Sequence, residues 1–266
     1  MALHVTGRRA DGYHLLDSLV VFASIGDRVT VTHSDRLALE ITGPEAGGLT
    51  GGADNLVLKA ARFFDPGCTV RITLVKNLPV ASGIGGGSAD AAATIKALAE
   101  LYDRPIPEPA DTACLGADVP ACMMGRPLRL RGVGEGLSEV PGLPAIDIVL
   151  VNPRIGLATP RVFAQLTSRS NPPLEGRLPQ WADPQAFCDW LGETRNDLLA
   201  PATRLVPEIA LVLASIRDTG CLFAGMSGSG GTCFGLYPPD GGAAKSARDR
   251  VHAQHPEWWC QNGSFA

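Results

Sequence analysis

Residues 79–98, PVASGIGGGSADAAATIKAL, join a loop with four glycines between positions 83 and 87 to an alanine-rich stretch. Glycine costs conformational entropy on folding, so this cluster needs a structural reason. Without Cβ atoms, backbone N–H groups can approach an anion closely, and a following helix aims its free N–H groups and positive dipole at the same place. The segment therefore predicts a phosphate-binding loop before a helix over Ser88–Leu101, with Ser88 as N-cap and Asp90 favourable near the positive end.

Two common phosphate loops do not match this segment. A P-loop requires Gly-Lys-Ser/Thr at the helix start, whereas Gly87-Ser88-Ala89 contains no lysine. A dinucleotide fingerprint requires a tight turn directly after a strand and an acidic residue further on, and neither is found here. An NAD-dependent oxidoreductase is accordingly the weakest of the functions that a glycine loop suggests.

The composition indicates a globular intracellular protein. Among 266 residues, 45% are hydrophobic and the formal net charge is −4, which argues against nonspecific binding to nucleic acid or an anionic membrane. The seven cysteines are scattered and contain no C-x-x-C, so neither a disulfide framework nor a zinc site is expected. Because the N-terminus lacks the apolar core of a signal peptide and no apolar run is long enough to span a membrane, we expect a cytoplasmic protein.

Hydrophobic periodicity and turn residues predict alternating strands and helices along the chain. Strands are expected over 15–25, 27–32, 37–41, 70–75 and 146–151, with hairpins over 128–140 and 221–237. Besides the helix after the glycine loop, helices are expected over 56–64, 184–191, 207–219 and 242–253. A domain boundary is placed near residues 141–144.

Several motifs, in order along nearly the whole chain, resemble one kinase superfamily. PVASGIGGGSAD resembles the central ATP-binding motif of the galactokinase, homoserine kinase, mevalonate kinase and phosphomevalonate kinase superfamily. TGRRADGYHLLDSLV, GADVPACMMG and GMSGSGGTCF are similar to those of its members that phosphorylate a cytidine diphosphate-linked methylerythritol at the 2-hydroxyl, in the non-mevalonate isoprenoid pathway. The resemblance implies an α+β, two-lobed fold: an N-terminal ATP-binding lobe over 1–143, bearing the glycine-rich loop, and a ferredoxin-like C-terminal lobe over 144–266.

The resemblance implies an ATP site and a substrate site. Asn55 and Lys76 match positions near the adenine, and the phosphate loop comprises Pro79, Val80, Ala81, Ser82, Gly83, Ile84, Gly85, Gly86, Gly87, Ser88 and Ala89. Mg²⁺ is expected as a counter-charge held mainly by the phosphates, with no protein metal site. Gly225–Gly230 resembles the superfamily's third motif, which closes under the phosphates.

Asp118 matches the catalytic aspartate, whose implied role is general base toward the acceptor hydroxyl. From the residues alone, a turn carboxylate at a helix end is an equally good interpretation. Tyr13 and His14 match residues that recognise cytosine, by stacking and by hydrogen bonding, and Phe163 matches the opposite side of an aromatic sandwich. Thr159 is placed beside this pocket.

The resemblance is incomplete at the beginning of the sequence. The family carries P-A-K-x-N upstream of the residues that match Leu3-His4-Val5, and the lysine and asparagine have no counterpart after Met1. The connections at 64–65 and 107–114 are also short. We expect these differences to reflect residues omitted from the sequence, although a shortened or truncated product fits as well. Were the 266 residues complete, we would expect a nucleotide-binding protein with little kinase activity.

Two rival functions stay open beside this one. The first is a superfamily kinase for another small alcohol, against which the Tyr13-His14 pair argues. The second is a noncatalytic nucleotide-binding module, which the missing lysine favours. The sequence does not indicate an oligomeric state.

Overall fold

The computed structural model describes residues 1–140 and 142–265 and divides into two compact units. Unit 1 contains Met1–Ile25, Ala81–Ile84 and Arg126–Ala266, and unit 2 contains Gly26–Val80 and Gly85–Gly125. The domain boundary expected between residues 143 and 144 falls inside unit 1. It was drawn along the sequence and does not correspond to a division between the two packed units, so it stays a prediction. Pro141, in the region assigned to that boundary, lies outside the described residues.

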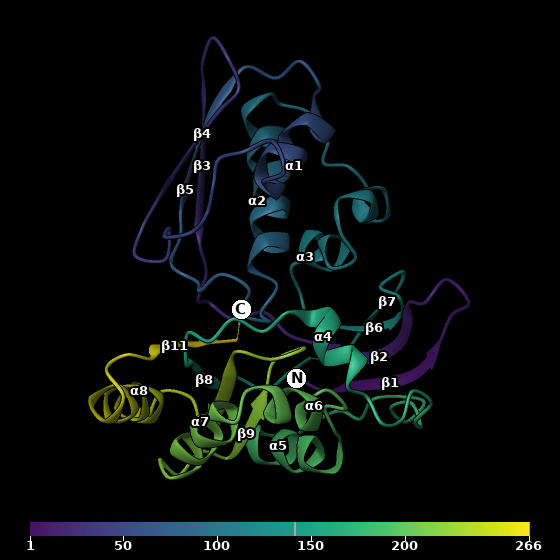
Figure 1. The fold of residues 1–266 in the computed structure, drawn as a ribbon, viewed down its shortest axis with the longest axis vertical. Coiled ribbons are helices and arrows are strands. Elements are labelled where there is room, and N and C mark those ends of the chain that lie inside the picture. The colour runs from purple at the N-terminus through teal and green to yellow at the C-terminus, as the bar shows by residue number, and fades with distance from the viewer. Residues whose placement is uncertain (141, 266) are drawn as a thin grey trace. The chain divides into compact units, whose positions relative to one another are not determined.

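Unit 2 is a three-stranded sheet covered on one face by helices. Its sheet has the order β3-β5-β4, with β3 antiparallel and β4 parallel to the central β5. Its strands are β3 (Arg28–His33), β4 (Ala38–Thr42) and β5 (Val70–Val75), and its helices are α1 (Leu56–Phe64), α2 (Gly86–Leu101), η1 (Pro109–Leu115, a 3₁₀ helix) and α3 (Val119–Met124). Figure 1 shows α1 and α2 side by side against this sheet, where they bury one apolar core.

Local sequence explains why α1 begins and ends where expected. The Asn55 side chain accepts a hydrogen bond from the backbone N–H of Val57, which caps the helix, and five of the nine helical residues are buried. The strand β5 alternates apolar and polar residues because one face meets these helices. Both elements confirm the predicted ranges.

Unit 1 is built on two four-stranded sheets. The first has the order β1-β2-β6-β7, and the second has the order β11-β8-β10-β9, both antiparallel throughout. The strands are β1 (Leu3–Arg8), β2 (His14–Val20), β6 (Leu128–Gly132), β7 (Gly136–Glu139), β8 (Asp147–Asn152), β9 (Phe223–Met226), β10 (Cys233–Tyr237) and β11 (Trp259–Ser264).

Unit 1 also contains helices, most of which share one buried core with the second sheet. They are α4 (Thr159–Ala164), α5 (Pro184–Glu193), α6 (Leu199–Leu205), α7 (Glu208–Arg217) and α8 (Ala243–Gln254). Buried side chains of α7 and α8, such as Ile209 and Val251, meet Val149 and Val151 of β8. In the described part of the chain no single helix is long and apolar enough to cross a membrane; α6 and α7 together have the required length and composition but are bent by 119°.

The structure corrects the expected start of the helix after the glycine loop. The residue that caps α2 is Gly85, in a left-handed conformation (φ 70°) with no side-chain hydrogen bond, so Ser88 is the third helical residue and not the N-cap. A left-handed cap suits glycine because it has no Cβ to clash. The strands β1 and β11 and the helices α4 and α6 were not predicted.

A buried ion pair ties the first sheet of unit 1 to the segment that follows α4. Arg129 on β6 pairs with Asp17 on β2 through two hydrogen bonds of 2.7 Å, and both side chains are at most 5% exposed. The remaining Arg129 donors reach the carbonyls of residues 174, 175 and 176, and Asp17 also accepts the backbone N–H of Leu174. Every charge is thus compensated, which a buried ion pair requires.

We predict that Arg129→Gln lowers the free energy of unfolding by about 3–5 kcal/mol, because it leaves the Asp17 carboxylate buried and unpaired. Urea unfolding followed by tryptophan fluorescence measures this loss. Arg131→Gln, at an exposed site on the same strand, serves as the control and should change stability by less than about 0.5 kcal/mol. Equal stability of the two variants would show that the Arg129 network contributes nothing.

Candidate active site

The glycine loop presents free backbone amides at the start of α2. The first intrahelical hydrogen bond runs from Ala89 N–H to the Gly85 carbonyl (2.9 Å), so helix geometry leaves the N–H groups of Gly86, Gly87 and Ser88 without an intrahelical acceptor. Gly87 is exposed, and an added Cβ there would meet nothing within 4 Å. These three residues therefore supply the amide cluster that the sequence predicted for a phosphate.

The middle of the same loop has a different role, because Ala81–Ile84 pack within unit 1. The Ser82 carbonyl accepts the N–H of Thr232 (3.0 Å), and the Gly83 carbonyl accepts the Ser227 hydroxyl (3.1 Å). A Cβ on Gly83, whose φ is +74°, would lie 2.2 Å from the Gly230 carbonyl oxygen. Gly83 is thus required for contact between two loops, a role that its place in a phosphate motif does not disclose.

This second loop, residues 227–232 between β9 and β10, overlaps Gly225–Gly230, the segment expected to be the third motif, whose first two residues lie in β9. Gly228 has positive φ (+52°), and a Cβ there would lie 2.8 Å from the Gly83 carbonyl oxygen. The Asn196 side chain donates to the carbonyls of Met226 (3.0 Å) and Gly228 (2.9 Å), which fixes one end of the loop. Asn196 was not predicted, since nothing local in the sequence marks its partners thirty residues away.

Thr159, the first residue of α4, lies beside the same loop. Its hydroxyl is hydrogen-bonded to that of Ser229 at 2.7 Å, and Thr159 itself is exposed. The structure thus brings Thr159 together with the third motif. Both residues belong to unit 1.

Asp118 lies between η1 and α3, at the N-cap position of α3. Its side chain makes no capping hydrogen bond, although the position would permit one, and Asp118 is exposed at the surface. The protein packed around it still desolvates the carboxylate and so raises its pKa above the usual value. The carboxylate is therefore available to a ligand rather than committed to the helix cap.

The two positions expected near the adenine are both engaged within unit 2. Asn55 uses its carbonyl oxygen to cap α1 and its amide to donate to the Thr50 carbonyl (3.2 Å). Lys76 is buried at the end of β5, where its ammonium group contacts Asp27 and Asp90. Asp27 was missed by sequence reasoning because its partners lie fifty residues further along the chain.

The β1–β2 hairpin positions Tyr13 and His14. The Arg9 N–H donates to the Tyr13 carbonyl (2.8 Å) across a turn in which Gly12 adopts φ +95°. Tyr13 is left 62% exposed, so its ring is accessible to a ligand.

His14 and Phe163 form a stacked pair, with ring centroids 4.7 Å apart and an interplanar angle of 26°. The buried Nε2 atom of His14 has no hydrogen-bond partner. Burial, together with the charges of Arg8 and Arg169, lowers the His14 pKa, so the ring is neutral at pH 7. Phe163, expected to oppose Tyr13 across a base, is thus in contact with His14 itself.

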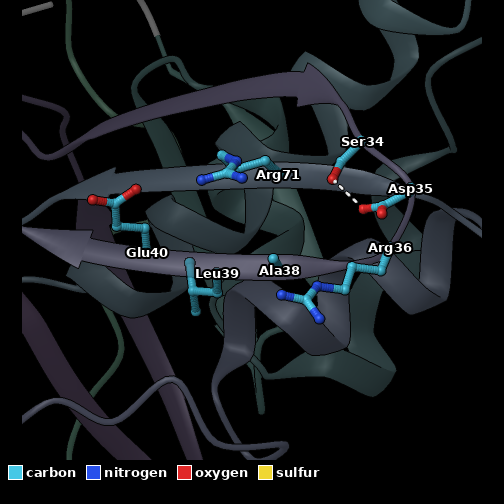
Figure 2. Close-up of a pocket in the computed structure, with 7 residues that line it drawn as sticks. All are labelled: Ser34, Asp35, Arg36, Ala38, Leu39, Glu40 and Arg71. Atoms are coloured by element: carbon cyan, nitrogen blue, oxygen red, sulfur yellow. Dashed lines mark hydrogen bonds between the residues drawn. The ribbon is translucent and has the colours of Figure 1, made fainter.

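A surface hollow on the sheet of unit 2 does not include any of the predicted site residues. Figure 2 shows it lined by Arg71 of β5, residues 38–40 of β4 and the β3–β4 turn. Its charged side chains are of both signs, with Arg36 and Arg71 against Asp35 and Glu40, and no predicted site residue lines it. It is therefore not part of the candidate site. Among the residues that the structure describes, no three or more histidine, cysteine or acidic side chains are grouped as a metal site requires.

Family models and curated relatives match most of this chain. Residues 55–126 match the N-terminal domain of GHMP kinases, and residues 182–257 match their C-terminal domain. A 4-diphosphocytidyl-2-C-methyl-D-erythritol kinase of Ruegeria pomeroyi is 56% identical over 264 residues, covering 99% of this chain and 95% of the relative. The kinase of the same name from Paracoccus denitrificans is 53% identical, covering 100% and 93%.

Solved structures give the same result for the fold. A crystal structure of 4-(cytidine 5'-diphospho)-2C-methyl-D-erythritol kinase is 34% identical, with a TM-score of 0.76, and the match covers 100% of this chain and 95% of that one. Homoserine kinase from Cytophaga hutchinsonii is 16% identical with a TM-score of 0.58, over 96% and 86% of the two chains, which is a likeness of fold alone. The predicted α+β, two-lobed architecture is confirmed.

We predict that Gly83→Ala lowers the free energy of unfolding by about 1–3 kcal/mol from backbone strain alone, because φ at this position is left-handed. The collision with the Gly230 carbonyl adds to that loss. Gly87→Ala is the matched control four residues later; its Cβ meets no neighbour, and alanine favours the helix by up to about 1 kcal/mol. Thermal unfolding of both variants makes the comparison, and equal midpoints would contradict a steric role for Gly83.

Proposed function

Because the chain belongs to the 4-diphosphocytidyl-2-C-methyl-D-erythritol kinases within the GHMP kinases, we propose that it transfers the γ-phosphoryl group of ATP to the 2-hydroxyl of 4-diphosphocytidyl-2-C-methyl-D-erythritol. The observation that carries this choice of acceptor is the His14–Phe163 stack with its unpartnered, buried Nε2. A neutral imidazole can exchange hydrogen bonds with the edge of a pyrimidine, and exposed Tyr13 can cover the base. A kinase for a simple small alcohol has no need of such a platform.

The amides of Gly86, Gly87 and Ser88 are proposed to bind the ATP phosphates. Their support is geometric, since they open the 16-residue helix α2 and have no intrahelical acceptor. Pro79–Gly85 precede this cluster along the chain, and the family resemblance implies that they belong to the same phosphate loop. Asn55 and Lys76 contribute by holding α1 and the stem of the loop in place, since both side chains already have internal partners.

Mg²⁺ is proposed to neutralise charge on the transferring phosphates. The described residues contain no cluster of three ligands, so the phosphates would supply most of its coordination. This arrangement leaves the protein side chains to position the substrates. We place the reaction in the cytoplasm, in the supply of isoprenoid precursors.

Asp118 is proposed as the general base. A carboxylate that is exposed, unpaired and desolvated can accept the proton of the acceptor hydroxyl as phosphoryl transfer proceeds. Its raised pKa makes it a stronger base than an ordinary aspartate. Thr159 is proposed to lie beside the cytidine pocket of His14 and Phe163 within unit 1, where its hydroxyl is paired with that of Ser229 at 2.7 Å.

We predict that Asp118→Asn lowers kcat at least about 100-fold, because the amide cannot accept the proton. The affinity for ATP should stay within about twofold, since the substitution alters no loop amide. Coupled ADP release, with Mg-ATP and 4-diphosphocytidyl-2-C-methyl-D-erythritol, measures turnover. Asp111→Asn in the preceding 3₁₀ helix is the control and should retain activity; turnover by Asp118→Asn at more than a tenth of the unsubstituted rate would refute the role.

We also predict that Phe163→Ala raises KM for the cytidine substrate about 5- to 100-fold, as expected for the loss of one base-stacking surface. KM for ATP should not change. Calorimetric titration with CMP measures binding of the base separately from catalysis. The control is Phe223→Leu, which removes an aromatic ring on β9, away from the His14–Phe163 stack. Failure of CMP to bind the unsubstituted protein would overturn the cytidine assignment.

A further inference from the structure

A buried cluster of one lysine and two carboxylates lies beneath the first turn of α2. Lys76 Nζ contacts Asp27 Oδ2 and lies 3.1 Å from Asp90 Oδ2, and the three side chains are only 5%, 1% and 7% exposed, respectively. A Cβ added to Gly86 would lie 3.3 Å from Lys76 Nζ and 3.6 Å from Asp27 Oδ2. The cluster thus supports the residue that opens the helix, on the side away from solvent.

The cluster also joins the two ends of the glycine loop. Asp27 Oδ1 accepts the backbone N–H groups of Asn77 (2.6 Å) and Leu78 (2.9 Å), directly before Pro79. Asp90 lies in the second turn of α2, directly after the loop. Lys76 therefore connects the strand side of the loop to its helix side, and all of these residues belong to unit 2.

The charges in this cluster do not balance when every group is ionised. Two carboxylates against one ammonium leave a net charge of −1 out of contact with water, and such a charge is costly. Asp27 is the better stabilised carboxylate because it accepts two backbone N–H bonds in addition to the lysine. Among the described residues Asp90 has a single ionic partner, Lys76, and it is therefore the group that takes up a proton.

The direction of the Asp90 pKa agrees with this assignment. Burial raises it to about 7, with a further increase from Asp27 that Lys76 partly offsets. Cys122 of α3 also lies in this neighbourhood and stays a neutral thiol, because burial, with further contributions from Asp118 and Asp90, raises its pKa to about 12. The charges of Asp118 and Lys96 act on Cys122 in opposite directions. Asp90 thus changes charge within the physiological range, one turn below the proposed phosphate amides.

We propose that the Lys76–Asp27–Asp90 cluster is a proton-sensitive support of the phosphate loop, and that protonation of Asp90 strengthens ATP binding. This inference rests on the proposed role of the loop in ATP binding. With Asp90 protonated, the cluster is neutral, and the N-terminus of α2 presents its full positive potential to the phosphates. With Asp90 ionised, an unbalanced negative charge behind Gly86 opposes the same phosphates. Asp27, Lys76 and Asp90 are accordingly positioning residues, since none of them needs to touch ATP.

The sign of the pH dependence follows from linkage. If ATP binds the protonated form more tightly, binding raises the pKa of Asp90, and the protein takes up a fraction of a proton near pH 7.5. The dissociation constant for ATP should rise as pH increases through 7. Over pH 6–8.5 we expect a rise of about threefold to tenfold for a charge at this distance in a partly screened site.

The test compares the unsubstituted protein with Asp90→Asn, which keeps the size of the side chain and removes its titration. Calorimetric titration with Mg-ATP at several pH values should give a ratio of dissociation constants, unsubstituted to variant, that increases with pH. Titration of the ligand is common to both proteins and cancels in this ratio. Glu100→Gln, exposed at the far end of α2, is the control and should follow the unsubstituted protein.

A second measurement does not depend on any variant. Titrations in two buffers of different ionisation enthalpy count the protons that the unsubstituted protein takes up with Mg-ATP at pH 7.5. Uptake that is lost in Asp90→Asn supports the inference. A pH-independent ratio, or equal proton uptake by both proteins, would overturn it while leaving the ATP site intact; failure of ATP to bind at every pH would instead overturn the proposed function.

Discussion

The close contact between two glycine loops is the constraint on which the site depends. At Gly83 and Gly230 backbone meets backbone without a side chain between them, and the distance leaves no space for a Cβ. Around this point the chain leaves unit 2, contributes Ala81–Ile84 to unit 1 and returns to begin α2. The α2 amides therefore directly follow, along the chain, a four-residue segment whose backbone is held by contacts within unit 1.

The affinity for an anion depends on more than the backbone amides, because buried charge beneath the start of the helix changes the electrostatic potential at the same place. The start of α2 combines exposed amides in front with the Lys76, Asp27 and Asp90 cluster behind. Backbone dipoles have the same strength at every pH, whereas the cluster has a carboxyl group that titrates. The net charge of the chain, −4, does not indicate the potential at the start of α2. That potential depends on the local arrangement of the amides and the Lys76, Asp27 and Asp90 cluster.

Sequence reasoning succeeded where the determining interactions are local. The range of α1 follows from the Asn55 cap and a helical apolar pattern, and that of β5 from simple alternation. It failed at Ser88, because a serine before an alanine-rich run is a good cap by propensity, whereas the actual cap is a left-handed glycine. Choosing between them requires the backbone path of the loop, which is fixed by residues 227–232, far along the chain.

The same distinction explains which parts of the site were found. Motif residues such as His14 and Asp118 stand out because their neighbours in sequence form a recognisable pattern. Asn196 and Asp27 do not, since the groups that they contact, mostly backbone, lie 30 to 51 residues away. A single motif also contains glycines of two physical kinds. Gly83 is needed because another backbone occupies the place of its Cβ, whereas a Cβ on Gly87 would meet nothing within 4 Å and its proposed role is to leave its amide open to a ligand. The sequence shows only that both residues are glycine, and the packing around each one distinguishes them. A substitution at Gly83 should therefore act mainly on stability, and one at Gly87 mainly on binding.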